Sequence, residues 1–568
     1  MLSTAQKKSK VRASLPAAKT LSLGRDWTEA FSGHPARALA TAIRQWIPSR
    51  RWFRSKAKAI ESVKLHEQIE VPMARQKAFL LLFEVSYTTK EQELYVLPLA
   101  CAFEKKAAEV EKNWPQQILT RISLKQPHKE GVIYDAIVSK EFCRALLALT
   151  SKHRRIAGHA GDLETEPTGV LERVRREQGL GIEPKLSKAE QSNSSIIYDS
   201  SIILKFFRRL DPGINPELEI ERFLSARTFP HSPALAGALE YHDNSGNTAT
   251  MAVLTSFIPG CHDAWEDTLV ALKEFYERVH NLPAKLQQAP SLSGALPSGN
   301  RKSVLPQKPA DLIGSYLRDA RTLGQRTAAL HIMLASDSKD PAFRPEPWTR
   351  RAQLALAKSL KDMTRENLQL LRDRLPSLPT TLHTLAQSTL AMEPLITNRF
   401  DRLTQEPLHA MRIRTHGDYH LGQVLHHERD FLIIDFEGEP AISLEARREK
   451  QSALRDVAGM IYSYFYAANA ALRELPRSGV FWNVSQTRNS WARYWSVWVG
   501  TTFLRAYLET ARKGAFLPPD EDALKIMLDI ELLRKAIYEL GYELNNRPDW
   551  VNIAFQVLLD LLNPDNPI

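Results

Sequence analysis

A chain of 568 residues, with 43% hydrophobic and 25% charged residues, has the composition of a globular protein and is long enough for two or three domains. Its formal charge of +11 at pH 7 would suit an anionic ligand, but lysine and arginine are spread along the chain without a nucleic-acid-binding motif, so we expect no nucleic-acid partner. No apolar run reaches membrane-spanning length, no apolar signal core begins the chain, and three scattered cysteines suggest no disulfides, so we expect a cytoplasmic protein without a membrane partner.

The first 25 residues form a basic segment rich in serine and alanine, which we expect to be disordered. Residues 26–150 predict a small α+β N-terminal module, in which the amphipathic stretch ALATAIRQWI precedes strand-like runs such as AFLLLFEVSYT. Tryptophans and arginines alternate in PSRRWFRSKAKAI. This pattern could stack on bases, but it more often covers a small core with long cationic side chains. We therefore expect no chemistry from this module.

Residues 151–262 predict a β-rich lobe with a polar turn, EQSNSS, between β-prone runs. Serine and asparagine in such a turn can offer hydroxyl and backbone N–H groups to phosphates, although a plain hairpin turn is the alternative. Lys205 lies in the apolar run IILKFF and needs an anionic partner there. The helix predicted from NPELEIERFLS offers Glu217, Glu219 and Glu221, and kinase-like folds use such a lysine–glutamate pair to direct the lysine at nucleotide phosphates.

Residues 263–568 predict a helical lobe that begins with Asp263 as a helix N-cap. Proline, serine and glutamine dominate residues 283–309, which we expect to form a flexible insertion. The stretches beyond it carry apolar residues every three or four positions, the pattern of packed amphipathic helices. His331 lies on one of these apolar faces, so we expect it to be structural.

The stretch RIRTHGDYHLGQVLHHERDFLIIDFEGEP, residues 412–440, concentrates polar groups between apolar runs. Asp418 lies in the polar part, and Asp435 ends the short strand-like run FLIID. A carboxylate in a loop can accept the proton of a substrate hydroxyl, and one at a strand end can hold a metal ion that bridges nucleotide phosphates. The stretch therefore predicts phosphoryl transfer to a hydroxyl.

HGDYHLGQVL and IIDFEGEP resemble the H-G-D-x-H-x-x-N loop and I-D-F/W strand end of the aminoglycoside phosphotransferase and choline kinase group, which shares the protein-kinase fold. Glutamine at the asparagine position, IDFEGEP and the later RDVAGM are more similar to bacterial maltokinases. Further similar segments, among them RRWF, EQSNSS, LGQRTAALH and KAIYELGYELNNRPDW, extend the resemblance over nearly the whole chain. The resemblance implies an α+β, protein-kinase-like fold of two lobes with an N-terminal cap module. It also implies an enzyme that uses ATP and Mg²⁺ to convert maltose into maltose 1-phosphate for α-glucan synthesis, linked to trehalose metabolism.

The resemblance assigns roles to the residues of this stretch. Asp418 would orient and deprotonate the sugar hydroxyl, and Gln423 and Asp435 would bind Mg²⁺. His416 and His420 would brace the loop by hydrogen bonding. Their spacing of four residues would suggest zinc only within HExxH on a helix, and that pattern is missing.

The resemblance also assigns the nucleotide side, where ATP would lie between the two lobes. Lys205 would contact the phosphates, held by Glu219, the best match among the helix glutamates. Ser192, Asn193 and Ser194 would line the phosphate loop. Some relatives are fused to a trehalose synthase domain, so association of this chain with a trehalose synthase is a hypothesis.

A sugar pocket needs aromatic faces for the rings and polar groups for the hydroxyls. The C-terminal region offers the tryptophan-rich FWNVSQTRNSWARYWSVWVG, and Tyr538 and Tyr542 lie one helical turn apart with Lys535 and Arg547 nearby. Periodicity alone fits a helical core equally well, and the maltokinase resemblance favours contact with the sugar.

Two alternatives stay open. The first is a related small-molecule kinase that acts on another sugar, an aminoglycoside or choline. The second is a non-catalytic, kinase-like partner protein, against which the intact set of Lys205, Asp418, Gln423 and Asp435 argues, since a scaffold needs no metal ligands.

Overall fold

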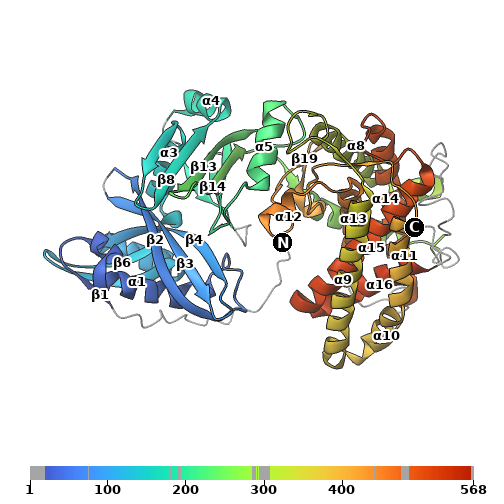
Figure 1. The fold of residues 1–568 in the computed structure, drawn as a ribbon, viewed down its shortest axis with the longest axis horizontal. Helices are drawn as coiled ribbons and strands as arrows, with labels where there is room; N and C mark the ends of the chain where they lie inside the picture. Colours follow the sequence, from blue (N-terminus) through green and yellow to red (C-terminus); the bar gives the residue numbers. More distant parts are fainter. Residues whose placement is uncertain are drawn as a thin grey trace. The chain divides into compact units, whose positions relative to one another are not determined.

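The chain divides into two compact units (Figure 1). Unit 1 comprises Met1–Thr228 and Pro233–Pro259, and unit 2 comprises Phe229–Ser232 and Gly260–Ile568. The computed structural model describes residues 20–74, 76–179, 182–187, 193–283, 289–290, 292, 307–440, 442–474 and 485–563. Most of the expected basic tail and most of the expected insertion lie outside these residues.

The first sheet of unit 1 is an antiparallel arrangement to which one short strand, β1, adds in parallel. Its order is β1 (Leu21–Leu23), β5 (Ile118–Lys125), β6 (His128–Asp135), β4 (Gln92–Phe103), β3 (Lys77–Tyr87) and β2 (Ile60–Pro72), and β12 (Arg209–Leu210) also pairs with β4. The helices α1 (Gly33–Trp46) and α2 (Glu104–Asn113) accompany it. Strand β3 is apolar on both faces because alternate residues enter different cores: Phe79 packs with α1, and Leu80 packs on the opposite face.

The interleaved aromatic and cationic residues near the N-terminus belong to the core on the α1 side. Trp46, Trp52 and Phe53 are buried there, and the Arg50 guanidinium lies 4.4 Å from the centre of the Trp46 ring. The cations thus cover a small aromatic core.

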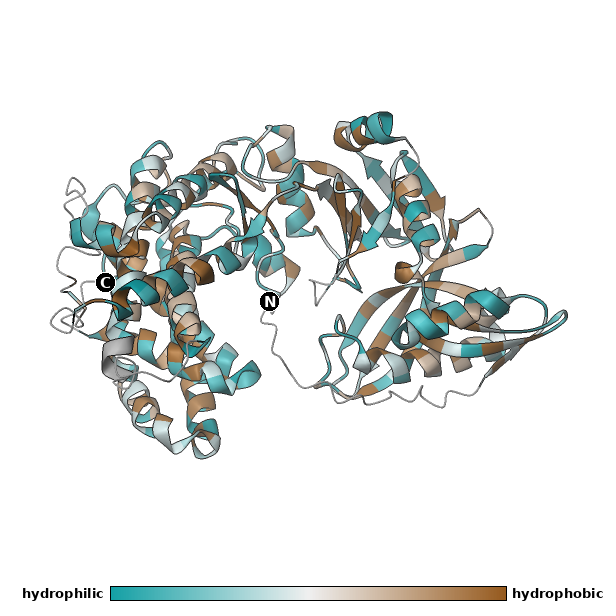
Figure 2. Ribbon diagram, turned by 180° about the vertical axis from the view of Figure 1, so that it is seen from behind, coloured by the Kyte–Doolittle hydropathy of each residue, from teal (hydrophilic) through white to brown (hydrophobic). Residues whose placement is uncertain are grey.

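The second sheet of unit 1 is antiparallel and has the order β7 (Arg154–Ala157), β8 (Gly161–Pro167), β13 (Leu235–Asp243), β14 (Thr248–Ser256), β11 (Ile202–Phe206), β10 (Ser194–Tyr198) and β9 (Pro184–Leu186). Three helices belong to this part of the unit: α3 (Lys140–Thr150), α4 (Gly169–Gln178) and α5 (Pro216–Ala226). Figure 2 shows hydrophobic residues along its strands. On β11, Leu204 and Phe206 are fully buried, so the alternation of the strand directs Lys205 to the opposite face.

The two sheets of unit 1 share one hydrophobic core. Leu80 and Val96 of the first sheet and Leu204 and Met251 of the second belong to the same buried cluster, to which α3 contributes Phe142. The N-terminal module and the β-rich lobe expected from the sequence therefore form a single compact unit, because neither sheet buries this face alone.

Unit 2 is mainly helical. Its longer helices are α6 (Ala264–His280), α8 (Tyr316–Leu334), α9 (Arg350–Arg374), α13 (Leu454–Glu474), α14 (Ser485–Ala511), α15 (Glu521–Asn546) and α16 (Val551–Leu562). The shorter ones are α7 (Gln307–Ile313), α10 (His383–Ala391), α11 (Glu393–Asp401) and α12 (Leu444–Arg448). Two small sheets complete it, β15 (His262–Asp263) with β18 (Val424–His427) and β19 (Asp430–Ile433), and β16 (Glu346–Pro347) with β17 (Met411–Arg412).

Helix α13 is central to unit 2, since it is buried on almost every side and packs against α6, α14 and α15. Helix α14 packs closely on α8, where a Cβ atom on Gly324 would come within 2.3 Å of the Phe503 carbonyl oxygen. Asp263 caps α6 as expected, its carboxylate accepting from the backbone N–H of Trp265 at 2.8 Å. No helix among the described residues is long and apolar enough to span a membrane.

Candidate active site

In unit 1, the buried Lys205 of β11 has a carboxylate partner on helix α5. Lys205 Nζ donates to Glu217 Oε2 at 2.7 Å, and both side chains are largely buried. The partner is Glu217 and not Glu219, the glutamate that the resemblance favoured, so that expectation is corrected. Residues two apart point to nearly opposite sides of a helix, and the start of α5 decides which one faces the strand.

Helix α5 begins directly before this glutamate. Asn215 is the N-cap and accepts from the backbone N–H of Glu217 at 2.8 Å, with Pro216 as the first helical residue. Glu221 follows Glu217 by one turn and is also buried. Burial, and then the neighbouring Glu217 charge, raise the pKa of Glu221 well above its usual value, so its neutral form is favoured.

The polar turn before β10 is described only in part. Ser192 lies outside the described residues, whereas Asn193 and Ser194 stand at the start of the strand. Ser194 Oγ accepts a hydrogen bond from Arg208 Nε at 2.9 Å, and Arg208 Nη2 lies 2.8 Å from Asp135 Oδ2 of β6. Sequence reasoning missed this buried arginine. Its signal, a charged residue directly after the apolar run ILKFF, is weak without the fold.

In unit 2, the loop that carries Asp418 is anchored from helix α13. Asp456 is fully buried and accepts from the backbone N–H groups of His416 (2.8 Å) and Gly417 (3.0 Å). It also bonds His331 Nε2 at 2.9 Å, and His331 Nδ1 lies 2.9 Å from the Tyr507 hydroxyl. Burial alone would raise the pKa of Asp456, but the bonds from His331 and the loop hold it below its usual value. This carboxylate therefore stays ionised and fixes the loop.

The two histidines of the loop are both engaged in local hydrogen bonds. His416 Nε2 lies 2.9 Å from the carbonyl oxygen of Ile434, and its ring packs between Tyr419 and Phe436. His420 Nδ1 accepts from the backbone N–H of Gly422 at 3.1 Å, and burial lowers the pKa of His420. These contacts hold the loop in place.

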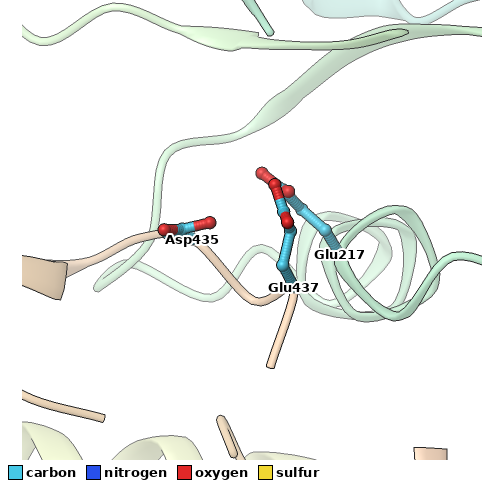
Figure 3. Close-up of side chains that lie close together, drawn as sticks. All are labelled: Glu217, Asp435 and Glu437. Atoms are coloured by element: carbon cyan, nitrogen blue, oxygen red, sulfur yellow. The ribbon is translucent and has the colours of Figure 1, made fainter. Parts of the chain in front are cut away.

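Two carboxylates follow β19. Asp435 has φ of +66°, a left-handed backbone conformation that aspartate tolerates better than most residues and that often marks a functional position. Gln423 Nε2 donates to Asp435 Oδ2 at 2.7 Å, and the backbone of Ile434 bonds the carbonyl of Gln423. Figure 3 shows Asp435 and Glu437 on the segment after β19, and Glu217 on α5 of unit 1.

The four residues predicted to face a sugar follow one another along α15 and its end. Lys535 Nζ pairs with Glu539 at 2.7 Å and lies 5.3 Å from the Tyr538 ring centre. The rings of Tyr538 and Tyr542 stack at 6.5 Å, and the Arg547 guanidinium lies 5.1 Å from the Tyr542 ring. We call these four residues the α15 row.

The α15 row begins next to the Asp418 loop. Burial lowers the pKa of Lys535, but Glu539 and then Asp418 raise it to above its usual value overall. Burial, then Glu439 and Asp418, raise the pKa of Tyr538. Asp418 therefore acts electrostatically on the first two members of the row.

Further side chains beside the row were not predicted. Glu543 pairs with Arg547 at 2.7 Å, and burial raises the pKa of Glu543 to about 7. Tyr466 stacks on Trp550, with ring centres 5.6 Å apart and planes 12° apart. Tyr466 lies in the apolar run of α13, so the sequence offered no reason to separate it from the core.

The tryptophans of α14 do not belong to the α15 row. Trp491, Trp495 and Trp498 are buried almost completely, and their rings pack on Phe275, Tyr316 and Tyr494. The expectation that they face a sugar is wrong, because the part of α14 that carries them is buried among other helices.

Comparison with known protein families identifies the family of this chain. Residues 46–138 match the maltokinase N-terminal cap domain, and residues 182–438 match the phosphotransferase enzyme family. The chain is an aminoglycoside-phosphotransferase-like protein of the maltokinase type. The expected fold class, a kinase-like phosphotransferase fold with an N-terminal cap, is thereby confirmed.

Two similar proteins and a similar solved structure are glucosamine kinases. The maltokinase-type chain is 24% identical to the glucosamine kinase of Streptacidiphilus jiangxiensis over 384 residues, 66% of this chain and 72% of the relative. It is 23% identical to that of Mycolicibacterium smegmatis over 382 residues, 66% of this chain and 78% of the relative. A solved structure of a glucosamine kinase with glucosamine, ADP and inorganic phosphate superimposes with a TM-score of 0.56 at 18% identity, covering 92% of this chain and 99% of the other.

The phosphotransferase family implies a magnesium ion, and the residues after the Asp418 loop fit one. Gln423, Asp435 and Glu437 offer oxygen atoms, which are the ligands that Mg²⁺ prefers, and the bond from Gln423 already orients the Asp435 carboxylate. The two loop histidines are bonded elsewhere. This donor set therefore suits a hard cation.

Proposed function

We propose that this protein is an ATP-dependent maltokinase, which transfers the γ-phosphoryl group of ATP to the 1-hydroxyl of maltose. The α15 row is the observation that carries the proposal. Lys535 and Arg547 are twelve positions apart, which corresponds to about 18 Å along a helix. A row of this length that begins beside Asp418 suits an acceptor of more than one sugar ring, and its stacked tyrosines suit pyranose faces.

The residues of this chain have distinct tasks in the proposed reaction. Asp418 orients the sugar hydroxyl and accepts its proton, and Asp456 holds the Asp418 loop through the backbone N–H groups of His416 and Gly417. Lys205, held by Glu217, binds the phosphates of ATP together with Asn193 and Ser194, and Ser192 is assigned to the same loop by resemblance alone. Gln423 and Asp435 would hold Mg²⁺, which would supply positive charge to the transferred phosphoryl group.

Glucosamine is the second candidate acceptor, because two relatives are glucosamine kinases and the carboxylates of Glu539 and Glu543 lie beside the α15 row. An ammonium group would need such a carboxylate. Those beside the row, however, already have cationic partners: Glu539 pairs with Lys535, Glu543 with Arg547, and Glu439 with Arg455 at 3.3 Å. Compensated charges favour a neutral, hydroxyl-rich acceptor.

One assay separates these acceptors. Purified full-length protein is incubated with Mg²⁺ and ATP, and ADP release is followed with maltose, glucosamine, glucose, kanamycin and choline. The proposal expects turnover with maltose, a phosphate on the anomeric carbon by NMR, and a fall of at least about 100-fold for Asp418→Asn. Turnover with glucosamine but not maltose would replace the first candidate by the second. Turnover with kanamycin or choline alone would contradict both, and none with any acceptor would favour a binding protein.

The product of this reaction, maltose 1-phosphate, would serve α-glucan synthesis, with maltose supplied from trehalose by a trehalose synthase. We propose association with such a synthase on the resemblance to maltokinases alone. Co-purification of the tagged chain with a separately produced trehalose synthase would support the partnership, and elution of the two as separate species at micromolar concentration would refute it.

A further inference from the structure

A hollow in unit 2 lies between helices α6 and α8, and its lining residues differ from those assigned above to ATP, Mg²⁺ and the sugar. It has a volume of about 240 Å³, and its walls also include His426 of β18, Phe431 of β19 and Tyr464 of α13. We call it the α6–α8 hollow. Sites for drug-sized ligands have volumes of about 300–1,000 Å³, so this one suits a smaller molecule.

Three carboxylates line the α6–α8 hollow, and two of them have a basic partner. Asp267 Oδ2 lies 2.8 Å from His426 Nδ1, and Glu274 Oε2 lies 3.8 Å from Arg278 Nη1. The third carboxylate, Asp319, has neither a hydrogen bond nor an ion pair with any residue that the structure describes. One negative charge of the hollow is therefore left for an occupant.

The position of Asp319 makes this uncompensated charge costly. The residue is partly buried, and burial raises the pKa of its carboxyl group above the usual value. His426 and Arg318 offset the rise only in part. A cation that enters the hollow would stabilise the ionised carboxylate.

The inner end of the hollow contains a second polar group without a partner. Tyr464 is 0% exposed, and its hydroxyl makes no hydrogen bond within the described part of the chain. Buried hydroxyl groups are normally hydrogen-bonded, because an unpaired one costs free energy. Burial raises the pKa of Tyr464, and nearby Tyr316 and Asp319 add to the rise, so the two unpartnered groups lie near each other.

The other walls of the hollow are aromatic and aliphatic. Phe431 is 6% exposed and stacks on His426 with 4.8 Å between the ring centres, and Leu323 is 1% exposed. The Tyr316 hydroxyl lies 2.6 Å from Thr268 Oγ1, and this hydrogen bond fixes the tyrosine ring. Aromatic faces attract a cation, and aliphatic walls favour an apolar group beside it.

A metal ion fits this hollow less well than an organic cation. Among the residues that the structure describes, the histidine and the carboxylates of the hollow do not bring three ligand atoms within 4.8 Å of one another. Divalent metal ions bind several such atoms at once.

We propose that the α6–α8 hollow binds a small organic cation, namely a protonated primary amine with an apolar part. An ammonium group donates three hydrogen bonds, so it can bond the Asp319 carboxylate and still offer donors to other oxygen atoms of the hollow, such as the Tyr464 hydroxyl. The apolar part would lie against Leu323 and Phe431. The proposal does not depend on which acceptor the kinase uses.

Calorimetric titration of the full chain without nucleotide tests the site, with 2-phenylethylamine as the probe. Asp319→Asn keeps the shape of the side chain and removes its charge, so the dissociation constant for this amine should rise at least about tenfold. Ala271→Leu fills part of the hollow and leaves its charges in place, and it should weaken binding by at least about tenfold as well. The matched control is Asp522→Asn, which removes an exposed carboxylate of α15 outside the hollow and should change binding less than about twofold.

Three results would overturn the proposal. The first is that the wild type does not bind 2-phenylethylamine at millimolar concentration. The second is an equal dissociation constant for Asp319→Asn and Asp522→Asn, which would place the amine elsewhere, as at the sugar site. The third is that 2-phenylethanol, which has a hydroxyl in place of the ammonium group, binds the wild type as tightly as the amine. This last comparison needs no variant, so it decides the matter even where thermal unfolding shows that a variant is not folded.

Discussion

At the scale of single residues, several charged groups in the interior of the described part of the chain have a defined neighbour of opposite charge or a hydrogen-bond partner. Lys205 has Glu217, Arg208 has Asp135, and Asp456 has His331. Burying a charge costs free energy unless the charge is paired. These pairs therefore mark positions where the fold fixes a charged side chain in place at some cost in stability. Two of the predictions below test such positions.

The ion pair of Lys205 predicts different effects for substitutions of Glu217 and Glu219. Glu217→Gln removes the carboxylate that bonds Lys205, so the KM for ATP should rise about tenfold while the protein remains folded. Glu219→Gln, the matched change two residues later, should leave it within about twofold. Steady-state kinetics with varied ATP measures both, and a larger effect for Glu219→Gln would contradict the pairing.

The raised pKa of Glu543 predicts that the stability of the folded protein depends on pH. Its pKa is raised by burial from 4.5 to about 7, so its contribution to stability is full below pH 4.5 and is lost as the pH rises through 7. The shift corresponds to about 3 kcal/mol. Glu543→Gln removes this loss, and the variant should gain stability relative to the wild type between pH 5 and pH 8. Urea unfolding at pH 5 and at pH 8 measures the stability of the wild type and the variant. An equal change in stability between the two pH values for both proteins would disprove the prediction.

At the scale of elements, helix α13 positions the Asp418 loop. It contributes Asp456 to the loop backbone and approaches the loop closely at Gly459, where a Cβ atom would lie 2.5 Å from the carbonyl oxygen of Tyr419. The motif RDVAGM thus contains both Asp456, which bonds the loop backbone, and Gly459, which the loop approaches closely. These two residues are three positions apart and lie on one face of α13. The resemblance identified this motif, but its physical task became visible only in the fold.

Gly459→Ala gives this close approach a test with a defined sign. Glycine to alanine within a helix usually stabilises it by up to about 1 kcal/mol, but here the methyl group meets backbone that cannot move freely. We expect a loss of about 1–3 kcal/mol and a lower turnover number. Gly169→Ala at the start of α4, where a Cβ atom would meet nothing within 4 Å, is the control and should be neutral or stabilising. Thermal unfolding and the kinase assay measure both, and a stabilised, fully active Gly459→Ala would contradict the packing.

At the scale of the whole molecule, the cap and the β-rich lobe form one unit with a common core. Arg208 and Asp135, each 1% exposed, join them across this core, and Arg208 also bonds Ser194 at the start of β10. The polar turn that we assign to ATP is therefore supported from the cap side of unit 1.

Asp135→Asn tests this connection. The change leaves the Arg208 guanidinium buried without its counter-charge, so the free energy of unfolding of unit 1 should fall by about 3–5 kcal/mol. Glu70→Gln removes the partner of Lys77 from an exposed pair on the same sheet and should cost less than about 1 kcal/mol. Denaturant unfolding, followed by tryptophan fluorescence, compares the two, and equal effects would show that the buried pair has no special role.

The sequence by itself determined the parts whose chemistry is local: the Asp418 loop, the strand end at Asp435, the apolar strand around Lys205 and the tyrosines one turn apart on α15. Each follows from residue type and short-range spacing. These local patterns do not depend on which distant elements pack against them. Only the tertiary structure decided that Glu217 pairs with Lys205, that Asp456 and His331 hold the loop, that the α14 tryptophans are core, and that cap and lobe share one interior. These depend on which faces of distant elements meet, and because packing satisfies buried charges and apolar faces together, no single stretch of sequence reveals them.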